Sequence, residues 1–349
     1  MIKLKDIALE SIGKSYIKEG GKLFGLKSRR VTTDEMNLIF QELKGKFLGL
    51  FSKMELSRSL KSKPDHGDID IVLLIDSHIN LVNEMKRVLG DSLVEFSKNR
   101  NIYSVLYRSS IGKDVHVDFL VTTAEEDFYP QWEYLSFNDF SGILGVFSRK
   151  CNFNYGTKGF FKIYIDDNNR YHYVHITNDL KKGLKILGYG DIIENYDKIE
   201  TVDDIVKFIS YSPLFSSEYY VGQDMNHSDR KRVRSGRPTA DYIRKSLISL
   251  NKKRTIEDND FFFKKLFPDD YNKYLDEVKK INTITVVKSK YNGQWIMDKF
   301  PEIKPGKFIG KIMLFWKERF GDSLNSVEED VLESETRNFI QKSISNKDM

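Results

Sequence analysis

The chain has 349 residues, of which 40% are hydrophobic, 31% charged and 13% aromatic, with 7 prolines, 22 glycines and a net charge of +5. This composition excludes a disulfide-rich mini-protein, a fibrous repeat and a low-complexity chain, and the length allows about two domains. No run approaches the roughly 20 apolar residues of a membrane-spanning helix and the start is polar, so we expect a cytoplasmic protein with no membrane partner.

The positive charge is concentrated in two segments. Residues 1–30 carry a net charge of +5 and residues 226–254 carry +8, so the rest of the chain is acidic by −8. Clustered basic residues are typical of proteins that bind a polyanion. The single cysteine, Cys151, leaves no internal disulfide and no Cys-rich zinc site.

A helix is expected from about Thr32 to Lys46. Thr32 and Glu35 have the spacing of a capping box, and the apolar residues that follow recur at helical period. The apolar run Phe47–Phe51 comes next, and we expect Gly49 to lie at the end of a strand.

The next segments predict a small mixed sheet. A polar, flexible segment at 57–67 precedes an aliphatic strand at 69–75 and an amphipathic helix at 79–89. Two β-rich runs, 101–108 and 114–121, then flank a short turn and predict a hairpin. The order of strand, helix, strand and strand favours a sheet backed by helices.

A second hairpin is expected near 160–177, and the patterns beyond Asn178 are mostly helical. The predicted fold class is therefore α+β, with a small mixed-sheet domain over residues 1–180 and a mainly helical domain over residues 181–349. The oligomeric state is not indicated.

Asp68 and Asp70 form the first chemical signal. Residues i and i+2 of a strand project from the same face, so two carboxylates are brought together between the aliphatic Ile69 and Ile71. A divalent cation relieves their repulsion, and oxygen ligands suit Mg²⁺. The pattern alone is expected about once by chance in a chain of this composition, so its context decides.

Asp118 supplies that context. In the strand predicted at 114–121, alternation places His116, Asp118 and Leu120 on one face. Next to Asp68 and Asp70, Asp118 completes a cluster of three carboxylates. The alternative is that Asp118 lies on an edge strand and faces solvent.

Gly49, Gly67-Asp68-Ile69-Asp70-Ile71 and Val117-Asp118-Phe119 together resemble the signature of the DNA polymerase β-like nucleotidyltransferases, nearest to the poly(A) polymerase and CCA-adding type. The resemblance covers roughly residues 47–121. One departure concerns the triphosphate-binding turn, because Gly49 is followed by Leu50-Phe51-Ser52-Lys53 where the superfamily has Gly-Ser or Gly-Gly.

The resemblance implies a nucleotidyltransferase mechanism. Asp68, Asp70 and Asp118 would be catalytic and would hold two Mg²⁺ ions, or Mn²⁺. A nucleoside triphosphate, with ATP and CTP as the first candidates, would donate its nucleoside monophosphate and release pyrophosphate. The residues expected to contact the nucleotide are Gly49, Ser52, Lys53, Gly67 and Arg232.

The basic run Arg230–Arg237, which contains Arg232, suits phosphate groups of RNA or of the triphosphate; a solvated loop is the alternative. The segment Lys304–Ile312 resembles a glycine turn in the helical region of CCA-adding and related RNA-tailing enzymes. The aromatic segment 128–134 either stacks on bases or fills a core.

The sequence therefore predicts a metal-dependent nucleotidyltransferase that acts on an RNA 3′ end, either of tRNA CCA type or of poly(A) type. Three alternatives stay open: a synthase of cyclic or linear nucleotide messengers, a transferase that nucleotidylates a protein or small molecule, and a catalytically silent RNA-binding relative.

Overall fold

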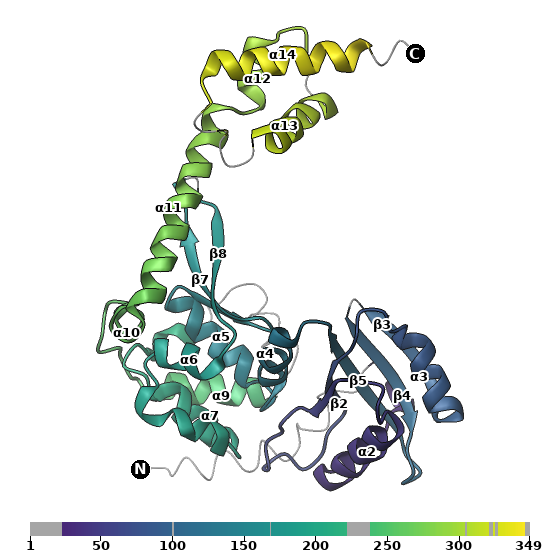
Figure 1. Cartoon of the computed structure of the whole chain (residues 1–349). Coiled ribbons are helices and arrows are strands. Elements are labelled where there is room, and N and C mark those ends of the chain that lie inside the picture. The colour runs from purple at the N-terminus through teal and green to yellow at the C-terminus, as the bar shows by residue number, and fades with distance from the viewer. Residues whose placement is uncertain are drawn as a thin grey trace. The chain divides into compact units, whose positions relative to one another are not determined.

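A computed structural model describes residues 23–99, 101–167, 169–221, 238–303, 306–320, 324 and 327–345. The chain divides into two compact units, one within residues 1–163 and 173–268 and the other within residues 164–172 and 269–349. The elements confirm the predicted α+β class (Figure 1). Among the described residues, no helix combines the length and the apolar character that a bilayer crossing needs.

The first unit contains a five-stranded sheet with the strand order β1-β2-β5-β4-β3. β2 and β5 are parallel, and the other neighbouring pairs are antiparallel. β5 therefore lies in the middle of the sheet, and Asp118 is not on an edge strand. The strands are β1 (Lys53–Leu56), β2 (Ile69–Leu74), β3 (Leu93–Asn99), β4 (Ile102–Arg108) and β5 (Asp114–Thr122).

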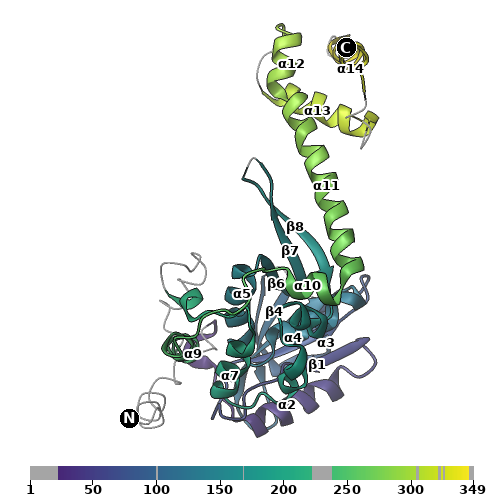
Figure 2. The same cartoon turned by 90° about the vertical axis from the view of Figure 1, so that its left-hand side faces the viewer.

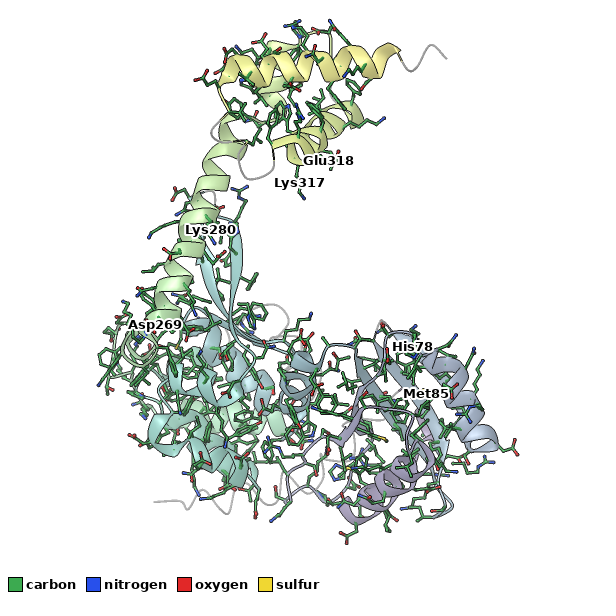
Figure 3. All side chains as sticks on the ribbon, in the orientation of Figure 1. His78, Met85, Asp269, Lys280, Lys317 and Glu318 are labelled. Atoms are coloured by element: carbon green, nitrogen blue, oxygen red, sulfur yellow. The ribbon has the colours of Figure 1, made fainter. Side chains whose placement is uncertain are left out.

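Two helices, α2 (Thr33–Lys46) and α3 (Leu81–Leu89), cover one face of this sheet (Figure 1). The predicted capping box at Thr32 and Glu35 is present. Met85 of α3, labelled in Figure 3, is fully buried in the core beneath these helices. The odd-numbered residues of β2 and β5 supply the sheet side of that core: Ile69, Ile71, Leu73, Val117, Phe119 and Val121.

The opposite face of the sheet is only partly covered, by helix α4 (Glu125–Leu135). Phe128 packs against Val72 and Leu74, which are even-numbered residues of β2. The indole of Trp132 donates a hydrogen bond of 2.7 Å to the carbonyl of Leu56 at the end of β1. The remaining even-numbered residues of β2 and β5 lie on this same face, and they include the acidic residues.

Gly49 is not at the end of a strand, so this expectation is wrong. Residues 47–50 form a turn after α2, and β1 begins only at Lys53. The Phe47 N–H bonds to the carbonyls of Leu43 and Gly45 and closes the helix, and Gly49 adopts a φ of +77° that suits a turn.

The rest of the first unit is mainly helical, as expected beyond Asn178. A small sheet has the order β6-β7-β8, and its β7–β8 pair, of which residues 164–172 belong to the second unit, confirms the second predicted hairpin (Figure 2). The elements are α5 (Phe140–Lys150), β6 (Phe153–Gly156), β7 (Gly159–Ile165), β8 (Tyr171–Thr177), α6 (Leu180–Ile186), α7 (Val202–Tyr211), α9 (Pro238–Ser249) and α10 (Phe261–Leu266). Short 3-10 helices lie at Gly25–Lys27, Gly90–Ser92, Gly190–Lys198 and Ser217–Tyr220. Elements on both sides of position 180 belong to this unit, and the boundary placed there stays a prediction.

Arg58 ties the segment after β1 to these helices. Its guanidinium lies 4.5 Å from the ring centre of Trp132, 4.6 Å from that of Phe137 and 4.8 Å from that of Tyr196. The same group donates a hydrogen bond of 2.8 Å to Asp197. This contact fixes the backbone that leads from β1 towards β2.

The second unit contains α11 (Pro268–Lys290), α12 (Gly293–Lys299), α13 (Lys307–Phe320) and α14 (Glu329–Ser345). Its core surrounds Trp316, whose indole N–H donates a hydrogen bond of 2.7 Å to the hydroxyl of Thr336. Ile296, Ile312 and Leu332 are fully buried beside it.

Candidate functional site

Asp70 and Asp118 occupy directly paired positions on the two parallel strands β2 and β5. Because the pairing also matches Ile71 with Phe119, whose side chains enter the helix-covered core, both aspartates project to the opposite face. The sequence therefore positions the two carboxylates through their apolar neighbours, which anchor each strand in one register.

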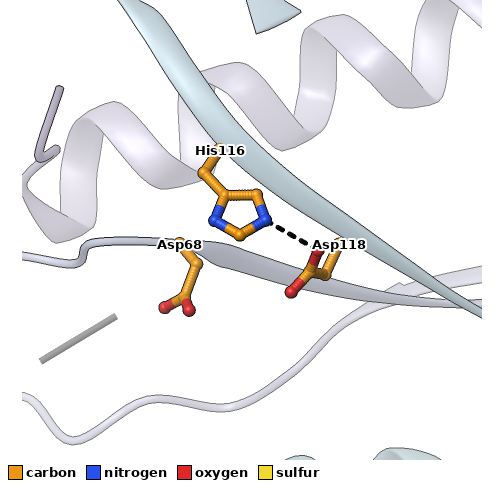
Figure 4. A group of neighbouring side chains, drawn as sticks. All are labelled: Asp68, His116 and Asp118. Carbon is orange, nitrogen blue, oxygen red and sulfur yellow. Dashed lines mark hydrogen bonds and ion pairs between the residues drawn. The ribbon is translucent and has the colours of Figure 1, made fainter. Parts of the chain in front are cut away.

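Asp68 directly precedes β2, and His116 lies on β5 two residues before Asp118. Ligand atoms of Asp68, His116 and Asp118 are all within 4.8 Å of one another. His116 is buried, and its Nε2 lies 2.8 Å from the Oδ1 of Asp118 (Figure 4). Asp68, Asp70, His116 and Asp118 thus form one group, here called the acidic cluster. The sequence placed His116 on the face of Asp118 but assigned it no role.

The charges of the acidic cluster shift two pKa values. Burial, together with the charges of Asp68 and Asp118, raises the pKa of Asp70 to about 8, and the charge of Lys63 only partly offsets this. Burial lowers the pKa of His116, but the hydrogen bond to Asp118 and the surrounding negative charge outweigh it, and the net shift is upwards. Close carboxylates that repel one another are the donor set that a hard divalent cation stabilises.

Gly67 directly precedes Asp68 and is buried. Lys53, by contrast, pairs with Leu74, four residues beyond Asp70 on β2, which corresponds to about 13 Å along the strand. Its ammonium lies 2.6 Å from Glu125 and 4.8 Å from the ring centre of Tyr129. The Ser52 N–H bonds to the Leu74 carbonyl at this same end of β2.

The structure thus does not bring Gly49, Ser52 and Lys53 next to the acidic cluster, because β1 runs antiparallel to β2 and starts where β2 ends. The end of β1 lies beside the cluster instead. Leu56 pairs with Ile71, and the Ser57 N–H donates a hydrogen bond of 3.0 Å to the Asp70 carbonyl. Sequence analysis missed this arrangement because β1 has only four residues, two of them charged.

Arg232 lies in residues 222–237, outside the described part of the chain. Of the aromatic segment after β5, Phe128 is a core residue, while Tyr129 is 53% exposed. The core interpretation is therefore correct for Phe128, and Tyr129 contacts Lys53.

No known family model matches the chain, and no curated protein matches its sequence. Among solved structures, the chain is similar to polymerase beta of Leishmania infantum in a ternary complex, with 14% sequence identity and a TM-score of 0.34. The match covers 41% of this chain and 61% of that one.

Proposed function

We propose that this protein is a metal-dependent nucleotidyltransferase, which transfers a nucleoside monophosphate from a nucleoside triphosphate to a hydroxyl group and releases pyrophosphate. The observation that supports this most is the pairing of Asp70 with Asp118 on parallel strands, with a carboxylate oxygen of Asp68 within 4.8 Å of one of Asp118. The sequence order of these residues, which resembles polymerase β-like nucleotidyltransferases, supports the same reaction.

Asp68, Asp70 and Asp118 would hold the divalent cations, two Mg²⁺ or Mn²⁺. A bound ion neutralises the charge on the triphosphate and lowers the pKa of the attacking hydroxyl. The three carboxylates act by fixing where the reacting groups lie, which accounts for most of the catalysis in phosphoryl and nucleotidyl transfer. Asp70 and Asp118 lie on two strands of one sheet, and Asp68 directly precedes the first of them, so the sheet is a rigid support for such positioning.

The donor triphosphate, for which ATP and CTP are the first candidates, requires cations and backbone N–H groups near the acidic cluster. Gly67 remains a candidate for close backbone approach because it directly precedes Asp68. Lys63 acts electrostatically on Asp70, and we add it to the candidates. Arg232 is retained as a phosphate contact on sequence grounds alone.

We propose an RNA 3′ end, of a tRNA or of another RNA, as the acceptor hydroxyl. The support is the net charge of +8 in residues 226–254 and of +5 in residues 1–30, since basic segments bind phosphate backbones without sequence preference.

A screen of donors and acceptors tests this function. The protein is incubated with each labelled nucleoside triphosphate, Mg²⁺ or Mn²⁺, and either total tRNA, an oligo(A) RNA or no RNA. Labelled RNA extended at its 3′ end supports the proposal. A small labelled product without RNA would assign the chain to messenger synthesis instead. Absence of pyrophosphate release in every mixture would contradict nucleotidyl transfer and favour an inactive RNA-binding relative.

A further inference from the structure

His116 is the member of the acidic cluster that an all-carboxylate magnesium site does not explain. Its side chain is only 5% exposed, and it lies on β5 two residues before Asp118. The register pairs Ile69 with Val117 and Asp70 with Asp118, and ligand atoms of His116 and of Asp68, which directly precedes β2, lie within 4.8 Å of each other. The imidazole is therefore placed opposite a carboxylate and beside a second one.

The two ring nitrogens of His116 have different surroundings. Nε2 is 2.8 Å from the Oδ1 of Asp118, so in the neutral ring Nε2–H donates to this carboxylate. Nδ1 then carries the lone pair. It is buried and has no hydrogen-bond partner among the described residues. In Figure 4 the ring edge that carries Nδ1 faces Asp68.

A buried nitrogen without a partner destabilises the folded protein, and a ligand that uses its lone pair removes this cost. Metal-bound histidines typically donate the other ring N–H to a carboxylate, which fixes the tautomer and the ring orientation. The hydrogen bond from His116 to Asp118 has this form. A carboxylate oxygen of Asp68, which would share the cation, lies within 4.8 Å of an imidazole nitrogen.

We propose that His116 supplies Nδ1 as a nitrogen ligand to a cation held by Asp68, while Asp118 orients the ring through Nε2–H, so that this site takes Mn²⁺ or a similar first-row transition ion in preference to Mg²⁺. The inference rests on the proposed function because it concerns the same cluster. Mg²⁺ favours oxygen ligands alone, whereas imidazole nitrogen suits transition-metal ions. Removing the nitrogen should therefore weaken Mn²⁺ binding much more than Mg²⁺ binding.

Electron paramagnetic resonance of the full chain with Mn²⁺ alone tests this directly. We expect one tightly bound Mn²⁺ whose spin-echo modulation shows coupling to ¹⁴N, and coupling to ¹⁵N when the wild-type protein is labelled with [¹⁵N]histidine. In His116→Asn the coupling is lost and the ratio of Mn²⁺ to Mg²⁺ affinity falls about tenfold or more. The matched control, His78→Asn, changes an exposed histidine between β2 and α3 (Figure 3) and should keep both properties.

The labelled wild-type protein makes the test independent of whether His116→Asn folds. Bound Mn²⁺ without histidine coupling, or coupling that persists in folded His116→Asn, would overturn the inference. The absence of any Mn²⁺ binding to the wild type would overturn it as well. Histidine-coupled Mn²⁺ in a protein that releases no pyrophosphate would leave the metal site standing and contradict the proposed function. Nucleotidyl transfer with Mg²⁺ but without histidine coupling would support the proposed function and overturn the inference about His116.

Discussion

Asp70 and Asp118 occupy paired positions of two neighbouring parallel strands, β2 and β5, in the middle of the sheet. Each is flanked by apolar residues that enter the core under α2 and α3, so neither carboxylate can leave the opposite face without a shift of the whole strand. Like charges held in this way are an electrostatic cost, and burial with this repulsion raises the pKa of Asp70 to about 8. Cation binding is the reason we infer for keeping them together.

Lys53 and Lys63 distinguish the sequence-based expectation from the structure. The sequence predicts that Lys53 contacts the nucleotide, whereas the structure favours Lys63. We expect Lys53→Met to leave the KM for the nucleoside triphosphate within about twofold, because Lys53 is held by Glu125 at the far end of β2. Lys63→Met should raise this KM about tenfold, since the charge of Lys63 reaches Asp70. Steady-state pyrophosphate release measures both. A large effect at Lys53 with none at Lys63 would restore the original assignment.

Arg58 should contribute strongly to stability. Arg58→Met removes its contacts with three aromatic rings and with Asp197, and we expect a loss of about 2–3 kcal/mol in the free energy of unfolding. Urea unfolding followed by circular dichroism measures it. Arg108→Met is the control, because the exposed pair of Arg108 with Asp114 should contribute little to stability. Equal losses in the two variants would contradict this account.

Glu133, which lies outside the acidic cluster, should make the stability of the fold depend on pH. Burial raises its pKa from 4.5 to about 7, and the positive charge of Arg58 only partly opposes this rise. The folded state therefore keeps a proton that the unfolded chain releases, and stability falls as the pH rises from about 4.5 to 7. Glu133→Gln should match the wild type near pH 4 and be more stable by about 1–2 kcal/mol at pH 8.

Thermal unfolding across this pH range measures the effect of Glu133→Gln. Glu126→Gln changes an exposed carboxylate of the same helix, and its pH profile should follow the wild type. Parallel profiles for Glu133→Gln and the wild type would show that Glu133 titrates normally in the folded protein.

In the second unit, the hydroxyl of Thr336 should matter more than its methyl group. Thr336→Val leaves the buried indole N–H of Trp316 without its acceptor and should destabilise this unit by about 1–3 kcal/mol. Thr336→Ser keeps the hydroxyl and should lose less. Unfolding followed by tryptophan fluorescence compares them, and a larger loss in Thr336→Ser would contradict the role of the hydrogen bond.

Sequence patterns predicted the elements that carry a clear period or cap. The capping box at Thr32, the aliphatic strand that contains Asp70 and the alternation around Asp118 are local properties, and all three appear in the structure. β1 and β3 were not predicted. β1 is four residues long, and β3 has no fully buried residue, so neither strand has an aliphatic run or a regular alternation.

Part of the site could not be predicted because it depends on strand pairing. The sequence placed three aspartates on two strands, and spacing alone could place His116 on the face of Asp118. Only the antiparallel pairing of β1 with β2 reveals that Lys53 lies far from Asp70 and that Ser57 lies close to it. Such register is a tertiary property that no local pattern contains.

The most direct test of the account is pyrophosphate release from nucleoside triphosphate by the wild type, Asp118→Asn and Asp114→Asn, each with its melting temperature. Asp118 belongs to the acidic cluster, whereas Asp114 begins the same strand and pairs with Arg108. We predict that Asp118→Asn loses at least about a thousandfold in rate with no loss of melting temperature, while Asp114→Asn keeps its rate. Wild-type rates in a folded Asp118→Asn would contradict the central claim that these paired strands carry the catalytic carboxylates.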